Sequence, residues 1–472
     1  MKEDDDALES REEHRDILNT TIRRYEEMRR KRERYFFDVD ALLRIIEHFI
    51  ESLDYSKATE VIKYARTIHP QSAQFRLKEA HIMALTNRER EALILLDEVE
   101  KVSPFDVEIY IIRGNILNML EQFEKAVVCF KKALEVADEQ KDDLHLSLAI
   151  TYANMAQYSI AVDHFKLCLE ENPDNEVALE EMEHSLELSN RGDEGIAFYN
   201  SLIDEHPYSH IIWFHLGNLF GRLGLFEKAL QAYDYCLLIK EDYSPAQLDM
   251  AHIYSLLERY EDAINRYKIA FEYCKPDAFT YYNIGECHEQ LENYDQARAY
   301  YKKAVKMVPD FAQAWYGIGV TLEAQDRWYE AIHYIKKAID IDNQHGDYWF
   351  ALGDCEYKLS NFDIAEACYK RVIDFDPDNV EGWITYADFL FEQNRVWEAS
   401  EVINAAIAHN SEEVELFYRH VCYLYLSGFH QEAFIRLDEA LEKDYSQHAV
   451  LFEIAPALEK DPMIICRIYP KS

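Results

Sequence analysis

Residues 278–304 read AFTYYNIGECHEQLENYDQARAYYKKA, and the same pattern recurs along most of the chain. The apolar positions follow the spacing of amphipathic helices, and a short polar link that begins at Asn293 separates two such stretches. The small residue Ala297 is followed four positions later by the large Tyr301 and then by a second small residue, Ala304. Small residues let two helices approach closely, while the large one fills the space between them. The stretch therefore predicts a pair of packed helices.

The small position of this pattern returns at a nearly constant interval. Every interval is 34 residues except one of 35, and the positions are Ala58, Ala92, Ala126, Ala161, Gly195, Ala229, Ala263, Ala297, Ala331, Ala365, Ala399 and Ala433. A fixed period of this length is typical of arrays in which each helix pair buries its apolar face against its neighbours. We therefore predict an all-α solenoid of about twelve tandem units over residues 39–447. Residues 1–38 are predicted to form a charged helical arm or cap, and residues 448–472 C-terminal capping helices.

This repeat resembles the tetratricopeptide repeat (TPR), a helix-turn-helix unit with the signatures W-x2-L-G-x2-Y, A-x3-F and P. The units that begin at Ala278, Ala312 and Gly346 match best. The resemblance covers residues 39–447 and implies a right-handed superhelix whose concave groove binds peptides.

One unit departs from the family pattern. Gly195 replaces the usual small alanine, and Glu183 stands where the family prefers glycine or alanine. A longer side chain at a close helix contact keeps the two helices apart, so we expect a looser pair in this unit.

The composition and the charge restrict the class of protein and of partner. Hydrophobic residues make up 49% of 472, whereas there are only 13 glycines and 11 prolines, which disfavours glycine-rich phosphate loops and folds with many tight turns. The 50 basic and 89 acidic residues give a formal charge of −39. Such a surface repels nucleic acids and anionic membranes, so we expect neither as a partner and favour basic proteins. The basic stretch 23–34 is interpreted as a solvated helix that pairs with acidic repeats nearby, and the alternative is an arm that binds nucleic acid or a membrane.

The cysteines and the hydropathy pattern favour a cytoplasmic protein. The nine cysteines are scattered and never in CxxC spacing, so we interpret most of them as buried small hydrophobic residues. The acidic N-terminus lacks the pattern of a signal peptide, and the chain has no apolar run of about 18 residues that could cross a membrane.

A binding surface is predicted on the first helices of the last five units. Positions 2, 5, 9 and 12 of each unit share one helix face, which the resemblance places along the concave groove. The aromatic residues there are Phe279, Tyr282, Tyr316, Phe350, Tyr357, Phe391, Tyr418 and Tyr425, and the acidic ones are Glu286, Glu289, Glu323, Asp354 and Asp388. We expect this groove to bind a basic, partly apolar protein segment. In the alternative interpretation, the aromatic residues pack between helices and the acids only solvate the surface.

The expected function is that of a non-catalytic protein-interaction scaffold or adaptor, with no cofactor, metal or catalytic residue. No GxGxxG, GxxxxGK[ST], HExxH or GxSxG motif occurs. A weaker alternative is an enzyme with an unrecognised site around His215, Asp249 and His252.

A further alternative is a structural protein that forms homo-oligomers through its terminal helices. Residues 448–459 are predicted to form an unpaired helix that contains Pro456, and a new helix is predicted to start at Asp461-Pro462. The apolar run from Met463 to Cys466 then needs cover. We expect it to pack on the last unit, and self-association through it is the alternative.

Overall fold

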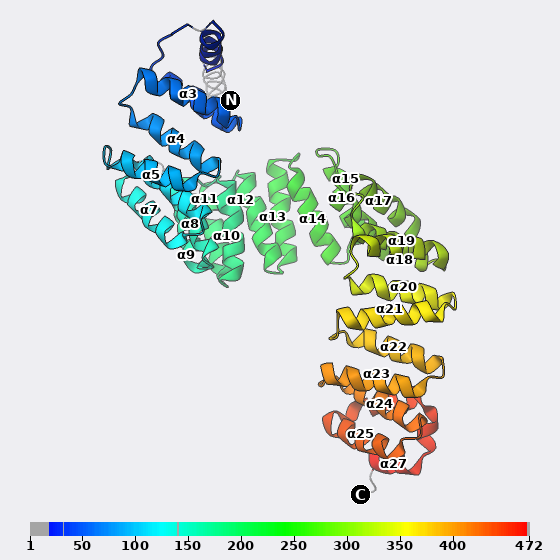
Figure 1. Ribbon diagram of the computed structural model, residues 1–472. Coiled ribbons are helices and arrows are strands. Elements are labelled where there is room, and N and C mark those ends of the chain that lie inside the picture. The colour runs from blue at the N-terminus through cyan, green and yellow to red at the C-terminus, as the bar shows by residue number, and fades with distance from the viewer. Residues whose placement is uncertain (1–17, 32, 139–140, 470–472) are drawn as a thin grey trace. The chain divides into compact units, whose positions relative to one another are not determined.

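Every regular element in the described part of the chain is a helix. The structure, a computed structural model, describes residues 18–31, 33–138 and 141–469. After the helical residues 18–31, the chain runs through twelve antiparallel helix pairs joined by short loops (Figure 1). The predicted all-α solenoid of helix-turn-helix units is therefore confirmed.

Each pair consists of a first and a second helix. The first helices are α2 (Val39–Glu51), α4 (Ala73–Leu85), α6 (Val107–Met119), α8 (Lys141–Asn154), α10 (Glu176–Leu188), α12 (His210–Arg222), α14 (Ser244–Leu256), α16 (Ala278–Gln290), α18 (Ala312–Glu323), α20 (Gly346–Lys358), α22 (Val380–Glu392) and α24 (Val414–Leu426). The second helices are α3 (Tyr55–Ile68), α5 (Glu89–Glu100), α7 (Phe123–Val136), α9 (Tyr158–Glu171), α11 (Gly192–Glu205), α13 (Phe226–Ile239), α15 (Tyr260–Ala270), α17 (Tyr294–Met307), α19 (Trp328–Ile341), α21 (Phe362–Phe375), α23 (Val396–His409) and α25 (His430–Lys443).

The pairs belong to two compact units, an N-terminal unit (Met1–Ala246) and a C-terminal unit (Gln247–Ser472). In the C-terminal unit, consecutive helices from α15 to α25 pack against one another in chain order. Its buried residues include one continuous cluster from Ala278 to Cys368 and another that extends from Ala365 to Ile468. Each repeat is thus stabilised by its sequence neighbours.

The turn between the two helices of each pair contains one residue whose backbone dihedral angle φ is positive. These residues are Leu53, Asn87, Glu121, Ala156, Asn190, Gly224, Glu258, Glu292, Asp326, Ser360, Asn394 and Gly428. The left-handed conformation lets a helix end and satisfy its last carbonyl groups before the chain reverses. Its recurrence once per pair shows that all repeats reverse the chain in the same way.

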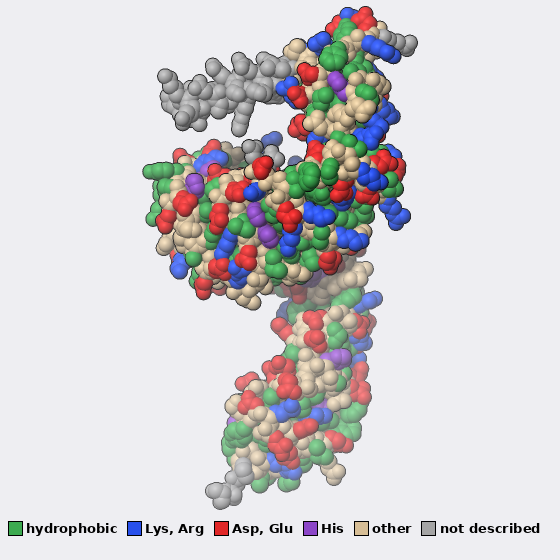
Figure 2. All heavy atoms as spheres, turned by 90° about the vertical axis from the view of Figure 1, so that its left-hand side faces the viewer, with side chains coloured by type: hydrophobic (Ala, Val, Ile, Leu, Met, Phe, Trp, Pro, Cys, Tyr) green, Lys and Arg blue, Asp and Glu red, His purple; other side chains and the backbone are tan. Residues whose placement is uncertain are grey.

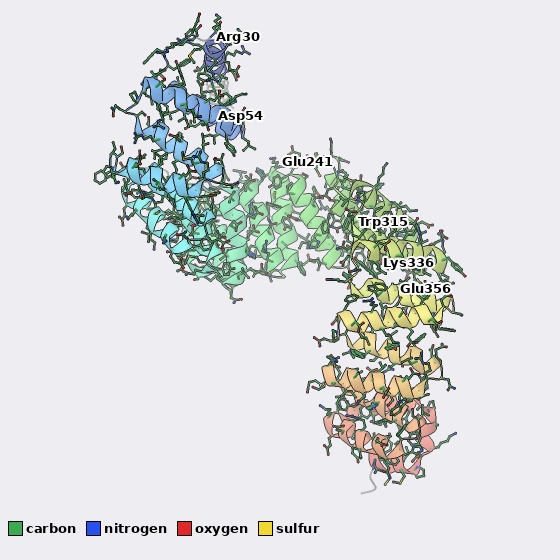
Figure 3. The ribbon with its side chains drawn as sticks, viewed as in Figure 1. Arg30, Asp54, Glu241, Trp315, Lys336 and Glu356 are labelled. Carbon is green, nitrogen blue, oxygen red and sulfur yellow. The ribbon has the colours of Figure 1, made fainter. Side chains whose placement is uncertain are left out.

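In four repeats, a tryptophan at the same repeat position of the first helix forms a hydrogen bond with the loop that precedes this helix. The indole Nε1–H of Trp315 donates to the carbonyl oxygen of Pro309 at 2.8 Å, and Trp349 donates to Asn343 at 2.9 Å. Trp213 and Trp383 make the same bond to the residue six positions earlier. These tryptophans therefore belong to the repeat framework, as the side chain of Trp315 on α18 illustrates (Figure 3).

The helix pair with Glu183 is looser, as predicted. Helices α10 and α11 approach each other less closely than α8 and α9 or α12 and α13 do, and α10 also packs directly on α12. Glu183 is buried and accepts a hydrogen bond from Nδ1 of His215, a residue of α12, at 2.6 Å. The carboxyl group thus points to the next repeat instead of making room for the second helix of its own pair.

The helical residues 18–31 dock on the first pair. Tyr25 and Met28 are buried in a cluster with Phe37, Leu42 and Ile45. Arg29 forms an ion pair with Glu60 of α3, as expected for a basic helix beside an acidic repeat. The part of the predicted arm at residues 1–17 lies outside the described residues.

The C-terminal segment differs in part from the prediction. Residues 448–459 do not form one helix but contribute to η1 (Tyr445–Ala449), α26 (Val450–Ile454) and η2 (Pro456–Lys460). The break precedes Pro456, because proline lacks the backbone N–H that would continue a helix.

The last helix begins where it was predicted. In α27 (Pro462–Ile468), the side chain of Asp461 accepts hydrogen bonds from the backbone N–H groups of Met463 at 2.7 Å and Ile464 at 3.2 Å. Ile464 and Ile468 are buried, and α27 contacts α25, whereas Met463 is exposed. The apolar run is therefore covered only in part, because Ile464 is buried, Ile465 is half-buried, and Met463 and Cys466 are exposed.

The described surface carries charges of both signs. Figure 2 shows Asp and Glu side chains spread over the visible face, with Lys and Arg between them. Seven of the nine cysteines are buried free thiols, as expected for small packing residues, whereas Cys274 is half-buried and Cys466 is exposed. None of the helices described combines the length and the apolar character that a membrane crossing requires.

Candidate functional site

The predicted binding residues lie on the first helices of the C-terminal unit. Helix α16 contacts α18 directly, and α18 contacts α20, so side chains on these three helices can form one continuous surface. We call it the first-helix surface and define it by Phe279, Tyr282, Glu286, Glu289, Tyr316, Glu323, Phe350 and Asp354.

The aromatic residues of this surface both pack and remain accessible. Phe279 is exposed and its ring stacks on Tyr282 at 6.3 Å between centroids. Tyr282, Tyr316 and Phe350 are half-buried. The Tyr316 ring lies 4.8 Å from that of Tyr348. Packing between helices therefore accounts for one side of these rings, and the other side stays open to solvent.

Three of the acidic side chains accept hydrogen bonds from tyrosine hydroxyls. Tyr282 donates to Glu286, Tyr301 donates to Glu289, and Tyr369 donates to Asp354, each at 2.7 Å. Burial nevertheless raises the pKa of Glu286, Glu289 and Asp354, because the ionised form loses solvation.

Glu323 is the most perturbed acid of the surface. Burial, together with the nearby charge of Asp354, raises the pKa of Glu323 to about 7, and Lys358 opposes the shift. Burial raises the pKa of the Tyr316 hydroxyl, and the charges of Asp347, Glu323 and Glu289 add to this shift. The carboxyl group of α20 thus acts on that of α18, and Glu289 of α16 acts on a tyrosine hydroxyl of α18.

No ion pair joins Glu286, Glu289, Glu323 or Asp354 to a lysine or arginine of the described residues. Glu356 on α20 provides a contrast, because Nζ of Lys336 on α19 lies 3.2 Å from its carboxylate (Figure 3). The acidic groups of the first-helix surface thus lie beside one another and tyrosine hydroxyls, and Lys358 acts on Glu323 and Asp354 only through its charge.

Asp388 differs from these four acids. Its carboxylate lies 2.9 Å from Nη1 of Arg419 and accepts a hydrogen bond from the Tyr423 hydroxyl at 2.7 Å. Phe391, predicted beside it, packs on the Tyr423 ring at 5.4 Å between centroids. We did not predict Arg419, although a basic residue four positions after Glu415 is a recognisable signal for a pairing residue on that helix.

Tyr418 corrects the predicted set. Its side chain is 0% exposed, and its hydroxyl donates to the carbonyl oxygen of Asp444 at 2.7 Å, so it has no surface for a partner. Tyr357 and Tyr425 are half-buried and donate to Glu392 and Asp461, respectively. The segment after α25 folds back over α24, which the array pattern alone does not anticipate.

His215, the first residue of the alternative enzyme site, has a structural partner. It is buried, and its Nδ1 forms the hydrogen bond with Glu183 described above. Within the described ranges, no group of three or more His, Cys, Asp and Glu side chains is placed to hold a metal ion.

Antiparallel helix pairs repeated every 34 residues define a helical-repeat solenoid. Tetratricopeptide repeat models match residues 107–140, 211–243, 242–310, 282–346 and 346–379. These stretches of the chain are therefore tetratricopeptide repeats. No curated protein matches it in sequence.

Several solved structures resemble the chain at low sequence identity. The APC/C hetero-tetramer Cut9–Hcn1 is 16% identical, with 84% of this chain and 90% of that chain covered and a TM-score of 0.39. YrrB, a TPR protein with an unusual peptide-binding site, is 21% identical over 40% of this chain and 96% of its own, with a TM-score of 0.35. MamA is 19% identical over 35% of this chain and 97% of its own, with a TM-score of 0.33.

Proposed function

We propose that the protein is a non-catalytic cytoplasmic adaptor that binds a basic, partly apolar protein segment on its first-helix surface. A tetratricopeptide repeat array is a protein-interaction scaffold, and the proposal adds where this one binds and what it selects. The observation that carries it is the set of four acids, Glu286, Glu289, Glu323 and Asp354, which lie beside accessible aromatic rings and form no ion pair among the described residues. Lys358 acts on Glu323 and Asp354 only through its charge, and the pKa of both carboxyl groups stays raised.

Holding these carboxylates together in their ionised form costs free energy. Partial burial and mutual repulsion raise the pKa of Glu323, and burial raises that of Asp354. A lysine or arginine from a partner would relieve both effects, because an opposite charge stabilises the ionised form. The rings of Phe279 and Tyr316 offer contact area at a low entropy cost for the apolar part of the same segment.

Neutralising two of these acids is expected to weaken binding. With Glu323→Gln/Asp354→Asn, the dissociation constant for a labelled lysine- and leucine-containing peptide should rise about tenfold, because two favourable charge contacts are lost. Fluorescence anisotropy on the full-length protein measures this change. The matched control, Asp340→Asn/Asp374→Asn, removes two exposed acids from the second helices α19 and α21. A loss of the same size in both double variants, or no loss in either, would contradict the assignment.

The same interaction is expected to depend on pH. Glu323, which faces Asp354, Lys358 and Tyr316, has a pKa of about 7, so it is largely protonated below that pH and ionised above it. A cationic segment prefers the ionised form, so affinity should rise by several-fold from about pH 6 to about pH 8 and then level off. Anisotropy titrations across this range measure the profile. In Glu323→Gln the rise should largely disappear, and a variant with the unchanged rise would rule out Glu323 as its cause.

A further inference from the structure

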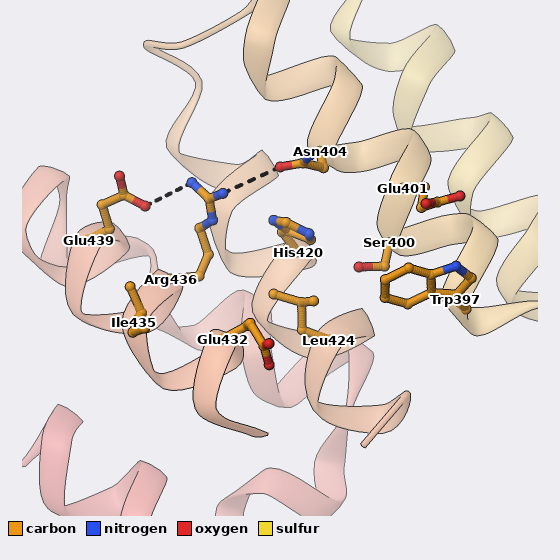
Figure 4. A pocket seen from close by; sticks show the side chains of 10 residues that line it. All are labelled: Trp397, Ser400, Glu401, Asn404, His420, Leu424, Glu432, Ile435, Arg436 and Glu439. Carbon is orange, nitrogen blue, oxygen red and sulfur yellow. Dashed lines mark hydrogen bonds and ion pairs between the residues drawn. The ribbon is translucent and has the colours of Figure 1, made fainter. Parts of the chain in front are cut away.

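We propose a second binding site, on the second helices of the last two repeats, which takes an arginine side chain of a partner protein together with an adjacent apolar residue. The site is a pocket of about 400 Å³ between α23 and α25, with α24 at its base (Figure 4). The residues that line it include Trp397, Glu401, His420, Glu432, Ile435 and Arg436. None of them belongs to the first-helix surface, so this proposal does not rest on the proposed function.

A buried histidine at the base of the pocket has an unused ring nitrogen. His420 is 5% exposed, and no described group forms a hydrogen bond with its Nδ1. Burial, with the charge of Arg436 adding to it, lowers the pKa of His420 to about 4, so the ring is neutral at neutral pH. A neutral imidazole has one nitrogen that accepts a hydrogen bond. A ligand N–H group entering between α23 and α25 would supply the donor.

The charges around the pocket favour a cation. Arg436 is already engaged, because its Nη1 lies 2.8 Å from Glu439 and its Nη2 donates to Asn404 at 3.4 Å. Glu401 and Glu432 are exposed and belong to no ion pair of the described residues. They come from opposite walls, α23 and α25, as Figure 4 shows. The charge left unbalanced is therefore negative.

Two exposed apolar side chains define the rest of the ligand. Trp397 is 46% exposed, and its ring packs on Phe429 at 4.6 Å between centroids, which holds the indole in place. A planar guanidinium stacks on an indole and can donate to carboxylates at the same time, whereas an ammonium lacks the planar face. Ile435 on the opposite wall is 69% exposed and suits an apolar neighbour of the arginine. These features together select an arginine–apolar pair.

The test uses the full-length protein with isotope-labelled tryptophan, so that each of the six indole N–H groups gives its own NMR signal. The Trp397 signal is assigned with Trp397→Phe. The probe is a glycine- and serine-based peptide with one arginine followed by leucine, and its counterparts carry citrulline or lysine in place of arginine. We expect a saturable shift of the Trp397 signal with the arginine peptide, none with the uncharged citrulline peptide, and several-fold weaker binding of the lysine peptide.

Charge variants locate the site. Glu401→Gln/Glu432→Gln should raise the dissociation constant of the arginine peptide about tenfold, whereas the control Glu412→Gln/Glu442→Gln, which removes two acids outside the pocket, should leave it unchanged. The first-helix variant Glu323→Gln/Asp354→Asn should also bind the probe normally at Trp397. Absence of the shift, an equal shift with citrulline, or an unchanged constant in Glu401→Gln/Glu432→Gln would overturn the proposal. Equal binding of the lysine peptide would overturn the preference for a guanidinium.

Discussion

Tyr301→Ala is expected to lower the free energy of unfolding of the C-terminal unit by about 3–5 kcal/mol, the range for removal of a large buried aromatic side chain. Tyr301 is buried on α17 between two glycines of neighbouring first helices. A Cβ added at Gly285 would lie 2.5 Å from its ring, and one added at Gly317 would lie 2.7 Å from it. Because neither glycine has a side chain that could move into the space, the cavity left by alanine would stay open.

Urea unfolding of the full-length protein, followed by tryptophan fluorescence, measures this effect. Tyr301→Phe is the control, because it keeps the ring and removes only the hydroxyl that donates to Glu289 at 2.7 Å. Loss of one hydrogen bond costs about 1 kcal/mol. If alanine and phenylalanine destabilised the protein equally, the packing between the two glycines would not be the main contribution of Tyr301.

His215→Leu is expected to destabilise the N-terminal unit by about 3–5 kcal/mol at neutral pH, as is typical when a buried charged group loses its partner. Glu183 is buried, and its nearest partner is His215 at 2.6 Å, while Nε of Arg222 lies 3.6 Å away. Burial already raises the pKa of Glu183. Without His215 the carboxylate would lose its shortest hydrogen bond and its pKa would rise further.

The sign of the pH dependence follows from this shift. A carboxyl group whose pKa is higher in the folded state binds its proton more tightly there, so folding loses stability as the pH rises from the unfolded-state pKa to the folded-state pKa. The loss in the free energy of unfolding that His215→Leu causes should therefore be larger at about pH 8 than at about pH 5. Thermal or urea unfolding at both values measures it, and a deficit independent of pH would mean that Glu183 does not cause it.

A second substitution separates charge from packing. Glu183→Leu added to His215→Leu removes the buried carboxyl group, and the double variant should recover most of the lost stability, because an apolar pair of similar volume replaces a buried polar one at little cost. A double variant as unstable as His215→Leu alone would show that the shape of the histidine, and not its bond to Glu183, stabilises the contact between α10 and α12.

Much of the fold could be predicted because its contacts are local. Each repeat packs mainly on the next one, so the 34-residue period, the small residues such as Gly285 and Gly317, and the large Tyr301 encode the packing directly. The repeat register of the sequence also placed Phe279 and Glu286 on one first helix, α16, and Glu323 on the first helix of the next repeat, α18. The unusual Glu183 was also visible in the sequence, and it predicted the looser pair of α10 and α11.

The sequence by itself determined the helix pairs, their order and the residues on each helix face, because these depend on the spacing of apolar and small residues within one or two repeats. Only the tertiary structure decided which candidate side chains are available. Arg419 forms an ion pair with Asp388, which lies 31 residues earlier in the chain. The segment after α25 covers Tyr418, whose hydroxyl donates a hydrogen bond to the carbonyl oxygen of Asp444, 26 residues later. The pocket around His420 is likewise lined by side chains from three helices, α23, α24 and α25. Such contacts join side chains whose meeting depends on the exact rotation and separation of neighbouring helices, which a repeat period does not specify.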